Sequence, residues 1–273
     1  MGAIPSRLEL GVRRPLTLSE RVAGISGYFL TVLRRTWQGG VVSRLLTPVF
    51  FLAAMGLGVG SLVDGSSGGV DGVPYLRWVV PGLAMASVMQ WAMGESTWPV
   101  MTMIRWNQVY AAMLAAPNRV PDLLLGHWLV IALGFTWGSA VFIGVAALFG
   151  GVGSWWALLG VPVAVLTGMA FVTPLFWIAA RVENDESFTS IFRLVITPLM
   201  LFSGTFFPLD QVPLWIRPLA WATPLWHGTE LARPLFLGDP TPDGWLIHVA
   251  VLLGYVAVGA VLARGAFVRR LAT

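Results

Sequence analysis

The sequence predicts an all-α integral membrane protein. It has six transmembrane helices, an N-terminal amphipathic interfacial helix, and outer re-entrant helices between spans five and six. Of its 273 residues, 56% are hydrophobic and only 11% are charged, a balance outside that of soluble domains. All 17 basic residues are arginine, and with both termini cytoplasmic 14 of them fall on the inner side and 3 outside. This bias follows the positive-inside rule. We therefore expect a multi-pass protein of the cell membrane with both termini in the cytoplasm.

The N-terminal part predicts a basic lead followed by a helix on the inner leaflet. Residues 1–16 have the composition of a disordered lead, and Thr17 and Glu20 have the spacing of a capping box. Apolar residues then recur at helical spacing, with arginines beside them. A helix packed on a partner protein is the alternative. We divide the chain into this region, 1–44, and a transmembrane domain, 45–273.

Six apolar stretches supply the predicted spans, because about 20 apolar residues cross the hydrocarbon of a bilayer. They are residues 45–63, 79–101, 124–149, 155–179, 190–207 and 244–263. The fifth is the weakest, because Arg193 shortens its apolar part and Pro198 and Gly204 interrupt it.

Two connections carry predicted short helices. Between spans two and three, residues 102–122 place Trp106, Val109, Tyr110 and Met113 on one helical face at the inner surface. Between spans five and six, residues 202–233 hold four prolines at intervals of five or six residues, with tryptophans between them. Proline ends helices and tryptophan favours the headgroup level, so this segment predicts short helices that dip into the outer membrane face.

Four polar residues are candidates for a pathway or gate. Glu95 is the only acidic residue well inside a predicted span, and it either contacts a conduit or pairs structurally, since a charge at that depth is costly. His227, Glu230 and Arg233 are spaced to form one polar edge, which either lines an outer exit or satisfies itself. The other two histidines, His127 and His248, are predicted to be isolated polar anchors at the two membrane faces.

The chain lacks the signatures of enzymes and of nucleotide binding. Cysteine is absent, which excludes disulfides and a cysteine nucleophile, and the absence of lysine excludes a Walker A loop. There is no H-E-x-x-H or G-x-S-x-G motif and no carboxylate pair within a span. Arginines at the inner leaflet account for the net charge of +4, so no nucleic-acid partner is predicted.

The order of these features resembles the ABC-2 type permeases of ATP-driven exporters, also called type V ABC exporters. The stretch YAAMLAAPNRVPDLLLG at 110–126 is similar to the family's coupling region. Residues 202–233 are similar to the branch that contains nodulation protein J and the daunorubicin-resistance permeases, and so are Asn184, Asp185 and Phe188 ahead of the fifth span. The resemblance covers nearly the whole chain in layout and these three stretches in motif.

The resemblance implies an export subunit that is not itself an enzyme. Two permease copies, or two similar permeases, would work with two separate ABC ATPase subunits that hold ATP and Mg, so this chain would hold no cofactor or metal. The residues that match the coupling region are Tyr110, Ala111, Met113, Leu114, Pro117 and Asn118. Residues 208–233 would close the outer exit. Family members move lipids, lipid-linked saccharides or drug-like amphiphiles, and the lack of a polysaccharide-recognition domain favours a small amphiphile.

Two other classes of protein stay open on the sequence alone. An ion-coupled secondary transporter would show an inverted repeat and buried charges near the membrane centre. An intramembrane transferase or protease would need a nucleophile or an acid–base pair.

Overall fold

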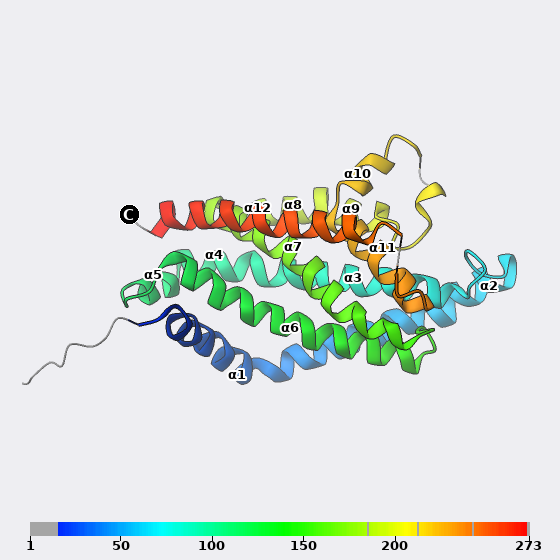
Figure 1. Ribbon diagram of the computed structural model, residues 1–273, viewed down its shortest axis with the longest axis horizontal. Coiled ribbons are helices and arrows are strands. Elements are labelled where there is room, and N and C mark those ends of the chain that lie inside the picture. The colour runs from blue at the N-terminus through cyan, green and yellow to red at the C-terminus, as the bar shows by residue number, and fades with distance from the viewer. Residues whose placement is uncertain (1–15, 185, 212, 242, 272–273) are drawn as a thin grey trace, which may run out of the picture.

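The computed structural model describes residues 16–184, 186–211, 213–241 and 243–271. All but the last residue of the predicted lead at 1–16, and Asp185 of the family motif, lie outside the described residues. The described chain forms a bundle of antiparallel helices (Figure 1). The start of α1, the short helix α5 and the end of α12 lie at one end, which we call the inner end; α2, α10 and α11 lie at the other, the outer end (Figure 1).

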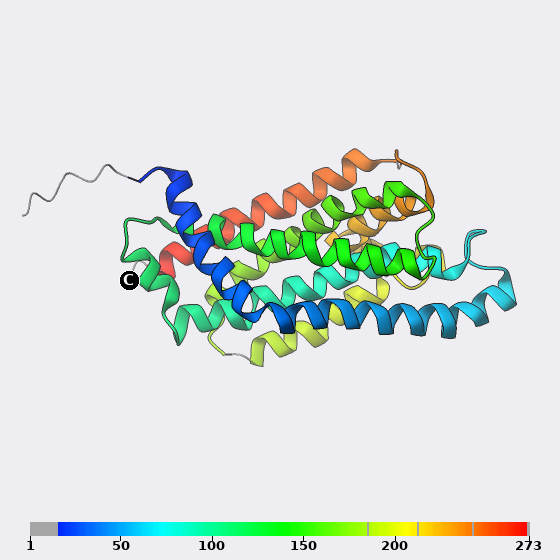
Figure 2. The ribbon, with the colours of Figure 1, turned by 90° about the horizontal axis from the view of Figure 1, so that it is seen from below.

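Helix α1 (Leu18–Ala53) begins at the predicted capping box. The Thr17 side chain accepts a hydrogen bond from the Glu20 backbone, and the Glu20 carboxylate accepts one from the Thr17 backbone at 2.8 Å. The helix runs without interruption from the predicted interfacial stretch into the first predicted span, and its first part lies oblique to the rest (Figure 2). A π-helical stretch, η1 (Ala54–Gly60), and α2 (Ser61–Ser67) continue it.

Helices α3 and α4 run back to the inner end, and α6 runs from there to the outer end (Figure 1). Helix α3 (Tyr75–Ser96) ends at Thr97, whose backbone leaves the helical region (φ −105°, ψ −98°), and α4 (Trp98–Arg105) follows. Helix α5 (Val109–Leu114) is a short helix at the inner end, and α6 (Val120–Leu148) crosses the whole bundle. The predicted helix at the inner surface is therefore present, but as two pieces.

Helix α7 (Gly160–Arg181) occupies the centre of the bundle. The 3₁₀ helix η2 (Trp155–Leu159) leads into it, and α3, α6, α11 (Pro224–Leu237) and α12 (Trp245–Leu271) all pack against it. Helices approach closely at Gly168, where an added Cβ would lie 2.5 Å from Val88 and 2.6 Å from Phe135. Small residues that allow such approach are typical of helix packing in membranes.

The fifth predicted span differs from the single helix expected at 190–207. Helix α8 (Glu186–Ile191), the π-helical turn η3 (Phe192–Ile196) and α9 (Thr197–Phe202) form this stretch. It starts earlier than predicted and ends at Phe202, because Gly204 adopts a positive φ of 76° that stops the helix. The predicted boundaries were therefore wrong at both ends.

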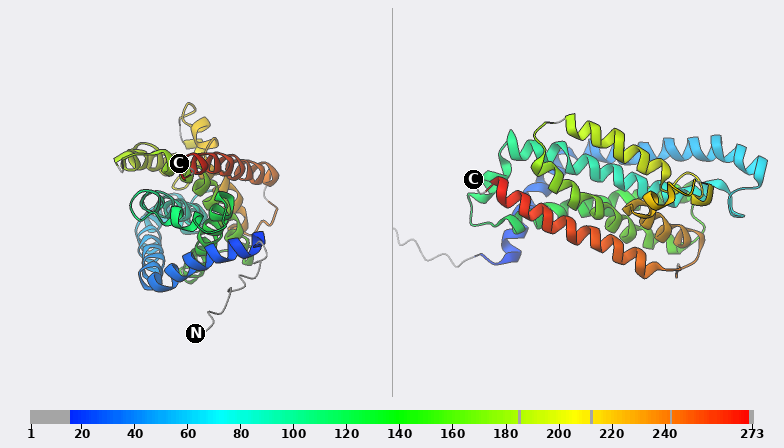
Figure 3. Two further views of the ribbon diagram at one scale, coloured as in Figure 1. Left: turned by 90° about the vertical axis from the view of Figure 1, so that its left-hand side faces the viewer. Right: turned by 90° about the horizontal axis from the view of Figure 1, so that it is seen from above.

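The proline-rich outer segment is broken as predicted. It contains η4 (Leu209–Gln211), α10 (Arg217–Trp221) and α11, and prolines lie in the first turns of both α10 and α11. A proline at this position lacks only a backbone donor that the helix does not use. Figure 3 shows these elements gathered at the outer end of the bundle.

Four stretches of the described chain are long and apolar enough to cross a membrane. They are Pro48–Ser66, Val120–Leu148, Trp155–Arg181 and Trp245–Leu271. These match predicted spans one, three, four and six. The second and fifth are not among them, since α3 carries Arg77, Gln90 and Glu95 and the fifth is divided into short pieces.

Candidate functional site

Helix α5 turns Tyr110 inward and leaves its opposite side exposed. Gln108 has a left-handed backbone (φ 48°), which separates α5 from α4. Trp106 is 66% exposed whereas Tyr110 is fully buried, so the prediction that both share one helical face was wrong. The αL residue between them rotates the chain and removes the helical register on which that prediction depended.

Tyr110 is held in what we call the inner aromatic cluster, made of Phe29, Tyr110, His127, Phe176 and Phe267. The Tyr110 hydroxyl lies 2.9 Å from Nδ1 of His127, and the Phe29 ring stacks on that imidazole with centroids 3.8 Å apart and planes 1° apart. Burial raises the pKa of the Tyr110 phenol, so the hydroxyl keeps its proton and donates it to an unprotonated Nδ1. His127 is therefore not the isolated anchor that we expected.

The cluster joins the short inner helix to the long helices. Phe29 comes from α1, His127 from α6, Phe176 from α7 and Phe267 from α12. The Tyr110 ring lies 5.6 Å from that of Phe267. A displacement of α5 must therefore move these rings or break their packing, because close-packed interiors transmit strain.

The turn after α5 is fixed by polar contacts. The Asn118 side chain donates to the Met113 carbonyl at 2.9 Å. The Asp122 carboxylate accepts from the Arg119 backbone at 2.9 Å and from the Arg21 guanidinium at 2.6 Å. These bonds hold the exposed side of α5 and the turn in a fixed position at the inner end. Among the predicted coupling residues, Ala111 and Pro117 are exposed, and Met113, Leu114 and Asn118 are partly buried.

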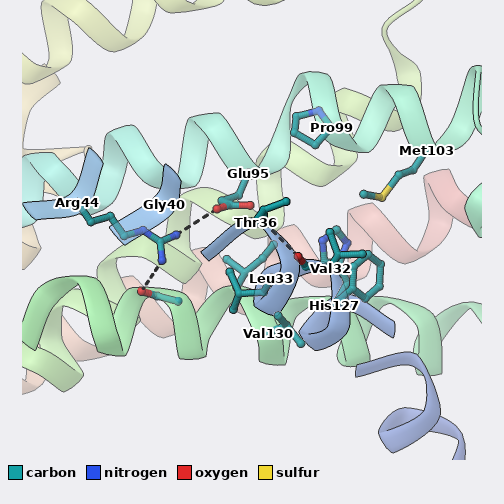
Figure 4. A pocket seen from close by; sticks show the side chains of 13 residues that line it. Val32, Leu33, Thr36, Gly40, Arg44, Glu95, Pro99, Met103, His127 and Val130 are labelled. Carbon is teal, nitrogen blue, oxygen red and sulfur yellow. Dashed lines mark hydrogen bonds and ion pairs between the residues drawn. The ribbon is translucent and has the colours of Figure 1, made fainter. Parts of the chain in front are cut away.

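A second polar site lies deeper, at a cavity of about 300 Å³ between α1, α3, α4 and α6 (Figure 4). Arg44 and Glu95 form an ion pair of 3.1 Å beside it, and Arg44 also donates to the Gly134 carbonyl at 3.3 Å. Figure 4 shows the two side chains directed toward one another from α1 and α3. The partner of Glu95 is therefore Arg44, which lies 51 positions away in the sequence. The sequence alone places Arg44 only among the arginines on the inner side.

Two glycines on α6 make room for this ion pair. A Cβ added at Gly134 would lie 3.3 Å from the Arg44 guanidinium, and one added at Gly138 would lie 2.6 Å from the Trp91 ring. Arg44 in turn lies 5.6 Å from the centre of that ring. The sequence signal for this site was an acid at membrane depth, which requires a partner, but nothing local identified Arg44.

At the outer end, the predicted polar edge of α11 divides into two groups. His227 lies 2.8 Å from His248 of α12, Nδ1 to Nδ1, and its Nε2 lies 3.0 Å from the Trp221 carbonyl. Glu230 pairs with Arg233 at 3.2 Å. His248 is therefore not isolated, and Glu230 and Arg233 satisfy one another as one of our two interpretations expected.

Arg233 connects α11 to other parts of the outer end. Its guanidinium lies 4.1 Å from the centre of the Trp78 ring and donates to the Gly204 carbonyl at 2.7 Å. Trp78 and Arg233 line a second cavity of about 300 Å³. Within the described part of the chain, no three His, Asp or Glu side chains gather as a metal site would need.

These features define a polytopic membrane protein with a short helix packed on the long helices at one end and an ion pair between its helices. The ABC-2 type transporter family matches residues 25–237, and the chain belongs to that family.

Its relatives cover most of the chain. It is 31% identical to nodulation protein J of Rhizobium leguminosarum bv. viciae, over 89% of this chain and 95% of that protein. It is 32% identical to nodulation protein J of Rhizobium leguminosarum bv. trifolii, over 89% of this chain and 94% of the relative. A shorter match, 28% identical over 22% of this chain and 16% of the relative, links it to a probable multidrug ABC transporter permease of Escherichia coli (strain K12).

Proposed function

We propose that the chain is the permease subunit of an ATP-driven exporter that moves a lipid, a lipid-linked saccharide or a drug-like amphiphile outward. Membership of the ABC-2 family supports a transport subunit whose ATPase is a separate protein. ATP and Mg would then act in that partner and not in this chain. The relatives' names, a nodulation protein and a multidrug ABC permease, do not fix the cargo.

The observation that carries the proposal is the mounting of α5. Its exposed side offers small residues, including Ala111, Ala112 and Ala115, on which a soluble subunit can dock closely. Its buried side is bound to the long helices through Tyr110 and His127. Closure of two ATPase subunits on ATP would push α5, and the inner aromatic cluster would pass this movement to α1, α7 and α12.

The proposal includes six membrane passes and two permease copies. The start of α1 and the end of α12 lie at the same end of the bundle, as an even number of passes requires (Figure 1). The α3–α4 and α8–α9 stretches would supply passes two and five, which need protein neighbours because they are more polar or broken. The inner end, where α1 starts and α12 ends, would face the cytoplasm, and η4, α10 and α11 would form the re-entrant outer gate.

The test is co-purification followed by matched substitutions. A tagged chain extracted in mild detergent is expected to bring with it a protein that has a phosphate-binding loop and hydrolyses ATP. Ala111→Arg, which places a bulky charge on the exposed side of α5, is expected to abolish co-purification. Ala222→Arg makes the same change at an exposed position of the outer end and should leave it intact.

A chain that exports its cargo from vesicles with an ion gradient but no ATPase would contradict the proposal. That result would favour the ion-coupled transporter, for which the Arg44–Glu95 pair is the relevant observation. Cargo modification by the purified chain alone would instead favour the intramembrane enzyme.

A further inference from the structure

The cavity beside Arg44 and Glu95 lies between α1, α3, α4 and α6, toward the inner end of the bundle. Glu95 comes 20 residues after Tyr75, the first residue of α3, which corresponds to about 30 Å along a helix and thus to the inner part of a membrane pass. Gly134, which binds Arg44, is near the middle of the 29-residue helix α6. Ionisable groups at such depth generally face a protein interior or a ligand pathway.

The two charges of the ion pair are not equally accessible to the cavity. The Arg44 side chain is 12% exposed and the Glu95 side chain 44%. The Arg44 guanidinium contacts three protein groups: it donates to the Glu95 carboxylate and the Gly134 carbonyl, and it lies near the Trp91 ring. Among the described residues, Arg44 is the only group that binds the Glu95 carboxylate, and it does so through one oxygen. The second oxygen therefore keeps its capacity to bind an occupant of the cavity that Glu95 lines.

The remaining walls offer an occupant few polar contacts. The Thr36 hydroxyl donates to the Val32 carbonyl, and His127 Nδ1 accepts from Tyr110, which puts the imidazole proton on Nε2. The other walls are glycine, proline or apolar side chains: Phe29, Val32, Leu33, Gly40, Pro99, Met103, Val130, Ile131 and Gly134. The volume of about 300 Å³ lies within the range of small-molecule pockets. An apolar chamber with one accessible carboxylate favours a lipophilic cation, whereas an anion would lie beside that carboxylate while Arg44 is covered.

We propose that this cavity within a single permease subunit binds a lipophilic organic cation, with Glu95 as its counter-ion. Arg44 then holds the carboxylate in place in the absence of the ligand. Binding depends only on the described cavity. That the bound cation is also exported cargo rests on the proposed function.

The test compares two probes of the same shape and opposite charge, tetraphenylphosphonium and tetraphenylborate. The purified chain is placed in nanodiscs of zwitterionic lipid without ATPase, and equilibrium binding of each radiolabelled probe is corrected for empty nanodiscs. We expect saturable binding of the cation and none of the anion. Glu95→Gln should weaken cation binding at least tenfold, and Glu95→Asp should retain most of it.

Glu183→Gln is the matched control, because Glu183 is also held by arginine but lies on an exposed connection away from the cavity. It should bind the cation as the unmodified chain does. Equal binding of both probes, or cation binding that Glu95→Gln leaves unchanged, would overturn the proposed site. If Glu95→Gln does not fold, the probe comparison on the unmodified chain still decides the point. Selective binding of the cation without its ATP-dependent export would support the binding site. It would count only against the claim that such cations are exported cargo.

Discussion

The two ends of the bundle use histidine and aromatic rings in opposite ways. At the inner end, His127 is buried, stacked on Phe29 and bonded to the hydroxyl of Tyr110. At the outer end, His227 is bonded to a second histidine, His248, beside a charged pair and a cavity. The inner histidine is bonded to a tyrosine hydroxyl among stacked rings, whereas the outer one is bonded to a second ionisable imidazole.

The difference teaches where movement is transmitted and where contacts can separate. An aromatic cluster that is packed between several helices passes on a displacement. A hydrogen bond between two imidazoles needs an unprotonated acceptor nitrogen, so protonation of the acceptor ring breaks it. We infer that the inner end is the stiff part of the permease and that the contact between α11 and α12 is the one that opens.

The largest expected effect follows from breaking the inner cluster. Tyr110→Ala removes a fully buried ring and leaves His127 Nδ1 without a donor, which should cost about 3–5 kcal/mol of local packing by the usual values for large aromatic truncations. Transport by the reconstituted complex, and the coupling of ATP hydrolysis to it, should be abolished.

Tyr110→Phe sharpens this result, because it keeps the ring and loses only the hydroxyl. It should cost about 1–3 kcal/mol and leave part of the transport activity. Stability is measured by thermal unfolding in detergent. If Tyr110→Ala transports normally, α5 does not transmit movement through this cluster.

A somewhat smaller effect is expected where α11 approaches α7. A Cβ at Gly228 would clash with the Thr167 side chain of α7. Gly228→Ala should therefore displace the outer segment and destabilise it by about 1–3 kcal/mol. Hydrogen–deuterium exchange should increase in α10 and α11 and stay unchanged in α5. Gly254→Ala, at a helical glycine with open space around it, is the matched control.

Acidification should loosen the outer end before the inner end. The Trp221 carbonyl can only accept, so His227 donates from Nε2 and accepts from His248 at Nδ1. Burial lowers the pKa of His227 below its usual 6.5. The neutral pair is therefore fully stabilising above about pH 6.5, and this stability decreases as the pH falls through that value and below.

Exchange in α11 measured between pH 7.5 and pH 5, corrected for the intrinsic pH dependence of exchange, should increase relative to α5. His248→Phe should remove most of the change. An equal increase of exchange in α11 and α5 would contradict the inference that the two ends respond differently to acid.

The smallest effect is expected in the turn that supports α5. Asn118→Ala loses the hydrogen bond to the Met113 carbonyl, worth about 0.5–1.5 kcal/mol. Transport should fall by a few-fold at most, with normal insertion and normal cluster packing. A complete loss of transport would indicate that Asn118 contacts the ATPase directly rather than supporting the turn.

Local signals predicted the elements that depend on neighbouring residues. The capping box at Thr17 and Glu20, the broken segment after Phe202, and four of the six predicted spans all follow from short-range rules. The exceptions are also local: the αL backbone at Gln108 and the π turn around Arg193 have weak sequence signals.

The sites were less predictable because their partners are distant in sequence. The pairs Arg44–Glu95, Tyr110–His127 and His227–His248 are 51, 17 and 21 positions apart. Charge at depth indicated that Glu95 needs a partner, but only helix packing decides which side chain reaches it. The same holds for the histidines, whose environments depend on neighbouring helices.

The bare surface of α6 at Gly134 and Gly138 has an evolutionary consequence. The Trp91 ring fills the space that a larger residue at 138 would occupy, and the Arg44 guanidinium lies against position 134, so enlarging either position requires these side chains to move. Natural variants in which Arg44 is replaced by a small residue should carry compensating bulk at 134 or 138. Covariation of position 44 on α1 with positions 134 and 138 on α6 would then show whether a lineage has kept the buried charge or replaced it with an apolar contact between the helices.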